Sequence, residues 1–169
     1  RKCGYNVAKS TTSVTFVWSI TILCACSFCC VGSNSICSDR TDGSDSNTGL
    51  VNSAGGAFRN INYAINYVAQ KYDFAGLNVQ IRVQGGTYTE NVQLPQWIGY
   101  LGNGFDQFTI IGENGTVTLT GATAAATILA AISEVPIRFK NITIGNANTS
   151  GIGVEADDGG FVALETITF

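Results

Sequence analysis

The chain has 169 residues, of which 45% are hydrophobic and 12% are charged, and it contains 20 glycines and 2 prolines. This composition is too apolar for a disordered protein and lacks the glycine period of collagen, so it predicts a β-rich globular domain. All 12 acidic residues lie at or after Asp39, together with 6 basic residues, so that part carries a net charge of −6 (6 minus 12). No basic patch is interleaved with aromatic residues, and we expect no nucleic-acid partner.

Residues 1–38 differ in composition from the rest of the chain and contain all 6 cysteines. Residues 14–31 carry no charge and follow a short basic stretch, which is typical of a signal-peptide core or a membrane anchor, although a stretch this short and diluted by Ser and Thr is marginal for a full span. A metal site is one alternative, but the two cysteine pairs are not separated by a loop, as zinc sites usually require, and the chain has no His. Disulfides are the other alternative, but they would link nothing in the coil. We therefore expect residues 1–38 to be a signal-like, anchor-like or non-native leader outside the folded domain of residues 39–169.

A dense cluster of turn residues, DGSDSNTG, occupies residues 42–49. Asp42, Asp45 and Asn47 offer oxygen atoms to a calcium ion, but the EF-hand pattern fails because no Glu stands at the twelfth position. We favour a plain turn in which Asp and Asn side chains bond nearby backbone groups.

An amphipathic helix is predicted over about residues 57–72. Phe58, Ile61, Ile65, Val68 and Tyr72 recur at intervals of three and four, which places them on one helical face. A helix in this position is expected to cover the exposed apolar end of a stack of strands.

Residues 79–94, VQIRVQGGTYTENVQL, predict a strand, a glycine corner and a second strand, with coiled strands beginning at about residue 78. The apolar pair at its end recurs three times at one constant spacing, as Val92/Leu94, Val117/Leu119, Ile142/Ile144 and Ile167/Phe169. A fixed period this short indicates a solenoid of short parallel strands in which each coil buries its apolar side on the next. An antiparallel sandwich with chance spacing is the alternative.

Three segments together resemble the opening of right-handed parallel β-helix proteins of the pectin-lyase-like superfamily: residues 43–49, residues 57–65 and residues 79–92. The family pattern is a G-x-D-x-N-x-G turn, a P-F-x-T-I helix start and a strand ending in G-x-Y-x-E. This chain departs from it at Ala57, where Pro is common, and at Asn60, where Thr is common. The resemblance covers about residues 40–169 and implies an all-β, right-handed parallel β-helix, a solenoid with about 25 residues per coil and an N-terminal capping helix.

Two later stretches suggest further features. Trp97, Tyr100 and Phe105 offer a stacking platform for sugars, but we favour a small satellite core under their loop. The Ala-rich residues 122–131 lie between two copies of the repeat, so we expect a strand with small side chains there rather than a helix.

No catalytic set is visible in the sequence. Without His there is no Ser-His or Cys-His pair. Facing carboxylates are the remaining route to glycoside hydrolysis, and the candidates are Glu90, Asp106, Glu113, Glu134, Glu155, Asp157, Asp158 and Glu165. No stretch matches the calcium and arginine motifs of the family's lyases, so no catalytic, cofactor-binding or metal residue is assigned.

Two further groups of residues are interpreted as structural. Arg82 and Arg138 stand at outward strand positions, where a solvated or cross-strand role is the default. The glycosylation sequons at Asn114, Asn141 and Asn148 are interpreted as turn residues, because Asn141 shares its repeat phase with Thr116 and Thr166.

The chain has no methionine and stops inside a predicted strand, and we interpret it as an N-terminal fragment truncated at residue 169. Our first hypothesis is a structural, glycan-contacting shaft of a phage or prophage tail-spike-like protein. The alternatives are a secreted polysaccharide lyase or glycoside hydrolase whose catalytic coils lie beyond residue 169, and a surface adhesin. The resemblance implies a polysaccharide or cell-surface glycan partner, a homotrimer, and a virion or extracellular location; a membrane partner requires residues 14–31 to be an anchor.

Overall fold

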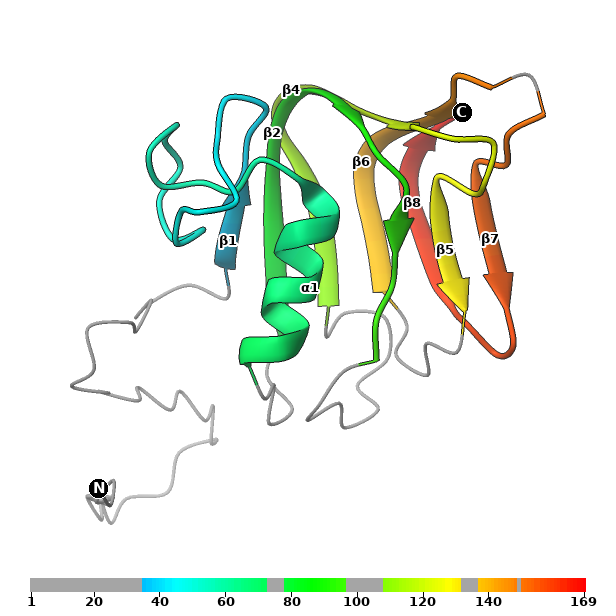
Figure 1. The fold of residues 1–169 in the computed structure, drawn as a ribbon, viewed down its shortest axis with the longest axis horizontal. Coiled ribbons are helices and arrows are strands. Elements are labelled where there is room, and N and C mark those ends of the chain that lie inside the picture. Colours follow the sequence, from blue (N-terminus) through cyan, green and yellow to red (C-terminus); the bar gives the residue numbers. More distant parts are fainter. Residues whose placement is uncertain (1–34, 73–77, 97–107, 132–136, 149) are drawn as a thin grey trace, which may run out of the picture.

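A computed structural model of the chain describes residues 35–72, 78–96, 108–131, 137–148 and 150–169. These residues form mostly β structure with one short helix (Figure 1). The elements in chain order are β1 (Ser35–Asp39), α1 (Ile61–Lys71), β2 (Val79–Thr89), β3 (Val92–Gln93), β4 (Phe108–Gly121), β5 (Ile128–Ala131), β6 (Ile137–Asn146), β7 (Val154–Asp157) and β8 (Val162–Thr168).

The strands form two sheets in which every pairing is parallel. The larger sheet has the order β1-β2-β4-β6-β8 and the smaller sheet has the order β3-β5-β7. From β2 onward the chain passes alternately from the larger sheet to the smaller one, so that each coil stacks on the coil before it (Figure 1). The antiparallel sandwich is therefore excluded, and the arrangement is compatible with a parallel β-helix.

The repeat period is confirmed for the last three copies of the repeat. Thr118 of β4 pairs with Thr143 of β6, which pairs with Thr168 of β8. The register of β6 with β8 extends this match, from Ile137 with Val162 to Thr143 with Thr168.

The predicted repeat is wrong at its first step, from Val92/Leu94 to Val117/Leu119. Val92 lies in the smaller sheet and pairs with Ile128, whereas Leu119 of the larger sheet pairs with Tyr88. The two apolar pairs look alike in sequence, but β2 continues to Thr89 before the corner, so the first copy falls on the other side of the coil. Of the predicted strand in residues 122–131, only Ile128–Ala131 forms strand β5, and residues 122–127 form the bend before it.

A left-handed bend recurs along the larger sheet. Asn141 and Thr166 have φ angles of 55° and 54° and stand one repeat apart, as their shared phase predicted. Thr116 does not follow them, because β4 bends at Asn114 instead, with φ of 54°. The pairing of β4 with β6 is interrupted between Ile111 and Thr118, which accommodates extra residues of β4 at this bend.

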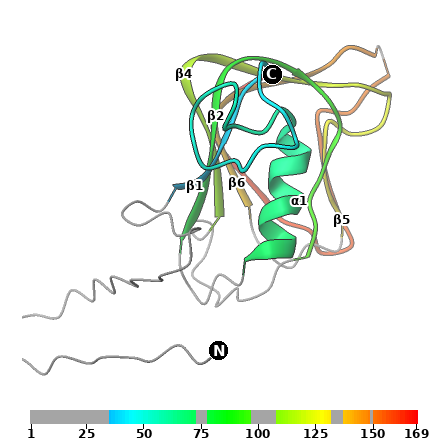
Figure 2. The same cartoon turned by 60° about the vertical axis from the view of Figure 1, so that its left-hand side comes forward.

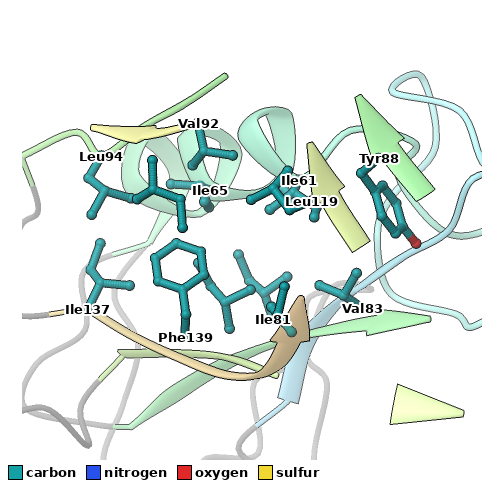
Figure 3. Packing of buried hydrophobic residues seen from close by; sticks show 14 of the residues in the cluster. Ile61, Ile65, Ile81, Val83, Tyr88, Val92, Leu94, Leu119, Ile137 and Phe139 are labelled. Carbon is teal, nitrogen blue, oxygen red and sulfur yellow. The ribbon is translucent and has the colours of Figure 1, made fainter. Parts of the chain in front are cut away.

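The hydrophobic core lies between the larger sheet and a layer formed by α1 and the smaller sheet (Figure 3). Inward side chains of neighbouring strands stack in rows, one of which contains Ile81, Ile110 and Phe139, all fully buried. Full burial of such side chains stabilises the fold by about 1.5–3 kcal/mol each. Stacking between coils, rather than packing within one coil, therefore holds the fold together.

Helix α1 is shorter than predicted at its start, which was expected near residue 57. Ala57 and Phe58 are buried in the segment before it, and the Phe58 ring packs against Tyr63 and Tyr67. Gly49 has φ of 71° and lies against this ring, so only a residue without a Cβ fits there. The segment before the helix is thus fixed by the loop that contains Gly49.

The helix covers one end of the stack. It contacts β1, β2 and β3, and Figure 2 shows it facing β1 and β2 across the core, beside the smaller sheet. The predicted apolar face is confirmed, since Ile61, Ile65 and Val68 are fully buried. The helix stands where the first coil would otherwise place a strand of the smaller sheet.

The larger sheet begins earlier than the expected boundary at residue 39, because Ser35–Asp39 pairs with β2 as strand β1. The anchor-like residues 14–31 lie outside the described residues. Within the described ranges, no helix is both long and apolar enough to cross a membrane.

The strained bend at Thr166 predicts a stabilising substitution. A β-branched residue is disfavoured at positive φ, whereas Asn tolerates it, so Thr166→Asn should raise the free energy of unfolding by about 1 kcal/mol in urea denaturation. Thr168→Asn, two residues further in the same strand and not at positive φ, is the matched control and should give no gain. Equal effects of the two substitutions would contradict the strain at Thr166.

Candidate functional site

The turn cluster before α1 is held by its own side chains. Asp42 forms an exposed ion pair with Arg40 at 2.7 Å. Asp45 accepts hydrogen bonds from the backbone N–H groups of Arg59 and Asn60 at 3.0 and 3.1 Å. These contacts tie the loop to the helix start.

Asn47 completes this arrangement by donating from Nδ2 to the carbonyl oxygens of Ala54 and Ala57 at 2.9 and 2.7 Å. The predicted bonds from Asp and Asn side chains to the backbone are therefore present, but they reach 7 to 15 residues along the chain rather than to nearby groups. In the described ranges no three metal-ligating side chains come together. Residues 42–49 therefore hold the segment before the helix in place.

Glu90 caps the N-terminus of α1 from the corner between β2 and β3. Its Oε1 accepts from the N–H of Ile61 at 2.9 Å and its Oε2 from the N–H of Asn62 at 2.8 Å. The helix has no acidic residue in its first turn, and Asn60 makes no side-chain cap bond, so Glu90 satisfies donors that the helix sequence leaves open. Sequence reasoning grouped Glu90 with the catalytic candidates and missed this role.

The Glu90 carboxyl is shielded from water, and this burial raises its pKa above the ordinary value of a glutamate. The hydrogen bonds from Asn62 and Ile61 act in the opposite direction by favouring the ionised form, but burial outweighs them. Glu90 is thus a shielded carboxyl whose two oxygens are occupied by the helix.

Asparagine side chains join the coils at the corner where the larger sheet ends. The side-chain oxygen Oδ1 of Asn91 accepts hydrogen bonds from the backbone N–H and the hydroxyl of Thr123 at 3.0 and 3.1 Å. Its Nδ2 donates to the carbonyls of Ala125 and Ala126, and Asn146 of the next coil donates to Thr123 and Ala125. The corner is therefore a network that spans three coils.

Charged side chains pair across neighbouring strands on the outward side of the larger sheet. Arg82 of β2 contacts Glu113 of β4 at 2.8 Å. Glu165 of β8 contacts both Arg138, at 3.2 Å, and Lys140 of β6. The Lys140 hydrogen bond, together with the nearby Arg138 charge, lowers the pKa of Glu165. The predicted cross-strand role of Arg82 and Arg138 is confirmed.

The outward side of the larger sheet carries a group of partly exposed side chains, which includes the basic residues of these ion pairs. Arg82, Ile111 and Lys140 stand side by side in register on β2, β4 and β6. Gln80 and Arg138 occupy an adjacent position along β2 and β6, and these five residues are here called the outer face. All five are at least partly exposed.

The second group is acidic and lies on the smaller sheet. Glu155 and Asp157 stand on β7, and Asp158 follows directly. Among the described residues no Lys or Arg forms an ion pair with these three. Asp106 and Glu134, the other two candidate carboxylates, lie outside the described residues, as do Trp97, Tyr100 and Phe105.

The sequon asparagines are used by the fold where the structure describes them. Asn114 donates from Nδ2 to Oε1 of Gln84 at 2.8 Å, and Asn114 and Asn141 both adopt the left-handed conformation at bends. Asn148 donates to Asn146 from its backbone and side chain. These positions support the interpretation that they are turn residues.

Comparisons of the chain with protein-family models, with curated proteins and with solved structures found no match.

Two predictions about the stability of the folded protein follow from the Glu90 cap. Glu90→Ala removes both acceptors and should lower the free energy of unfolding by about 2 kcal/mol in urea denaturation. Glu90→Gln keeps one oxygen acceptor and cannot ionise, so a pH dependence that it removes belongs to the Glu90 carboxyl.

Because the folded-state pKa of Glu90 is raised, its protonated form favours the folded state; this contribution is fully present below the unfolded pKa and is lost as pH rises through the folded pKa. The stability of the wild type relative to Glu90→Gln should therefore fall as pH rises from below the ordinary glutamate pKa of 4.5 toward neutrality. A difference that grows with pH would show that the hydrogen bonds to the ionised form outweigh burial.

Proposed function

We propose that the chain is part of the shaft of a right-handed parallel β-helix of the pectin-lyase-like kind, and that it serves a phage or prophage tail-spike-like protein as a structural, glycan-contacting element. The observation that carries this proposal is the stack of parallel coils, in which inward residues fill the core while several of the described carboxylates bind other parts of the fold. Glu90 caps the helix, while Glu113 and Glu165 pair with basic residues of adjacent strands. Such an arrangement suits a stiff rod that presents a regular surface.

The outer face supplies the chemistry for a glycan. Its guanidinium, ammonium and amide groups donate hydrogen bonds to hydroxyl and carboxylate oxygens, and Ile111 offers an apolar contact between them. Arg82, Arg138 and Lys140 are three of the six basic residues after Asp39, although that part of the chain has a net charge of −6. Glu113 and Glu165 pair with these three cations, but the cations outnumber the two carboxylates, and this local excess of positive charge favours an acidic polysaccharide.

Among the described residues, the feature that favours the enzyme alternative is the acidic group of β7. Glu155, Asp157 and Asp158 have no ion pair to Lys or Arg within the described residues, which leaves their carboxylates available for chemistry. A polysaccharide lyase or hydrolase would act on the same class of ligand as the shaft binds. A test with polysaccharides therefore separates the two functions.

The experiment incubates the purified protein with acidic and neutral bacterial polysaccharides and measures both binding and chain cleavage. The shaft account predicts binding without cleavage, and stronger binding to the acidic polymers at low salt. Formation of new reducing ends would favour a hydrolase, and unsaturated-uronide absorbance would favour a lyase. Absence of both binding and cleavage across the panel would contradict the glycan function.

Variants locate the binding surface. Arg82→Gln combined with Lys140→Gln should weaken binding about tenfold, which corresponds to about 1.4 kcal/mol. Lys71→Gln combined with Arg59→Gln removes the same charge from the region of α1 and should leave binding unchanged. Equal losses in both variants would show that net charge, and not the outer face, determines affinity.

The resemblance also implies a homotrimer and a virion or extracellular location. Light scattering on the purified protein measures the first directly, and a trimer is the expected result. A surface adhesin of the same fold would share the glycan binding and differ in the particle or cell that carries it.

A further inference from the structure

Two basic residues of the outer face are separated by an uncharged position. Arg82 of β2 pairs in register with Ile111 of β4, and Ile111 pairs with Lys140 of β6. Lys140 in turn pairs with Glu165 of β8. One row across the strands is therefore composed of a cation, an apolar residue, a second cation and a carboxylate, so its positive charges stand on alternate strands of the sheet.

The spacing of this row matches a repeat of two sugars. Neighbouring parallel strands lie about 4.8 Å apart, so the backbones at Arg82 and Lys140 are separated by about 10 Å. One sugar residue of an extended polysaccharide advances the polymer by nearly the distance between two neighbouring strands. A polymer laid across the strands would thus place successive sugars over Arg82, Ile111 and Lys140, and only the first and the third would meet a cation.

Both cations have the capacity to bind a ligand carboxylate together with their partner in the fold. Arg82 donates from Nε to Oε1 of Glu113 at 2.8 Å, and a guanidinium has five N–H donors. Lys140 shares the carboxylate of Glu165 with Arg138, so positive charge is in excess there. Because the side chains of Arg82 and Lys140 are 46% and 35% exposed, a carboxylate can approach each of them from solution.

The other two positions of the row disfavour a carboxylate. Ile111 is apolar and partly exposed, so a carboxylate above it would lose water without gaining a donor from that residue. Glu165 would repel a carboxylate placed over it. A polymer with a carboxylate on every sugar therefore meets an unfavourable position after each favourable one, whereas a neutral sugar can lay the C–H groups of its ring on Ile111.

We propose that the outer face selects a polysaccharide in which uronate residues alternate with neutral sugars. Arg82 and Lys140 each bind a carboxylate, and Ile111 contacts the neutral sugar between them. Arg138, two residues before Lys140 on the same strand, strengthens the positive charge at the second of these carboxylates. Ile111 is then the specificity-determining residue of the glycan site proposed above, on which this inference rests.

Three acidic polymers separate alternation from charge density. Hyaluronan alternates glucuronate with N-acetylglucosamine, whereas polygalacturonate carries a carboxylate on every sugar. Polygalacturonate that is methyl-esterified at random on half of its carboxylates has the mean charge of the alternating polymer without its order. Fragments of equal length are titrated into the full chain at low salt, with dextran as the neutral control, and affinity is measured by isothermal titration calorimetry.

We expect hyaluronan to bind at least about threefold more tightly than either form of polygalacturonate, as exposed charge pairs allow. If either form of polygalacturonate binds as tightly as hyaluronan or more tightly, glycan binding stands and the selection of an alternating polymer is overturned. Absence of binding to every polymer would overturn the glycan function itself, and this inference with it.

Variants test whether Ile111 determines the preference. Ile111→Lys places a third cation in the row, so it should strengthen the binding of unmodified polygalacturonate and abolish the preference for hyaluronan. Gln93→Lys adds the same charge at an exposed position of the smaller sheet and should keep the preference. Circular dichroism checks that both variants are folded. A preference that survives Ile111→Lys, or that Gln93→Lys removes as well, would overturn the role of Ile111.

Discussion

The fold depends on the stacking of apolar side chains between coils. One coil has too little apolar surface facing inward to bury it alone, so each strand of the larger sheet relies on its neighbours in register. The fully buried row of Ile81, Ile110 and Phe139 shows how this works. The constraint explains why every described strand pairing is parallel, since only a chain that returns in the same direction can align equivalent residues again.

The same constraint makes the two ends of the stack different. At the β1 end, α1 covers the core, and its N-terminus is fixed by Glu90 and Asp45, which come from other segments. At the other end of the described residues, Leu164 of β8 and Phe169 after it are exposed. The outer face, whose side chains lie outside the core, is the surface for which glycan binding is proposed.

Much of the architecture could be predicted from the sequence because periodic patterns report it directly. The alternation in residues 79–83 and the repeat from Val117 onward predicted the strands and their register, and the spacing of Ile61, Ile65 and Val68 predicted the helix. The first step of the repeat failed because a Val-x-Leu pair has no feature that tells one side of a coil from the other. Only the observed pairing of Val92 with Ile128 resolves this.

The candidate sites were harder to predict than the fold. In sequence, a glutamate such as Glu90 resembles any other catalytic candidate, and its capping role depends on a helix that begins 29 residues earlier. The one available signal was the absence of an acidic residue in the first turn of that helix. Arg82 and Arg138 were predicted correctly, because an outward position in a strand alternation already implies a cross-strand neighbour.

Cysteine cross-linking tests the parallel register most directly. In a chain whose six native cysteines are replaced by Ser, Thr118→Cys with Thr143→Cys places two thiols on paired residues of β4 and β6. Gln93→Cys with Thr118→Cys has the same separation along the sequence but places one thiol in each sheet. The stack predicts that mild oxidation cross-links the first pair within the monomer and leaves the second pair free, and cross-linking of the second pair in preference to the first would contradict it.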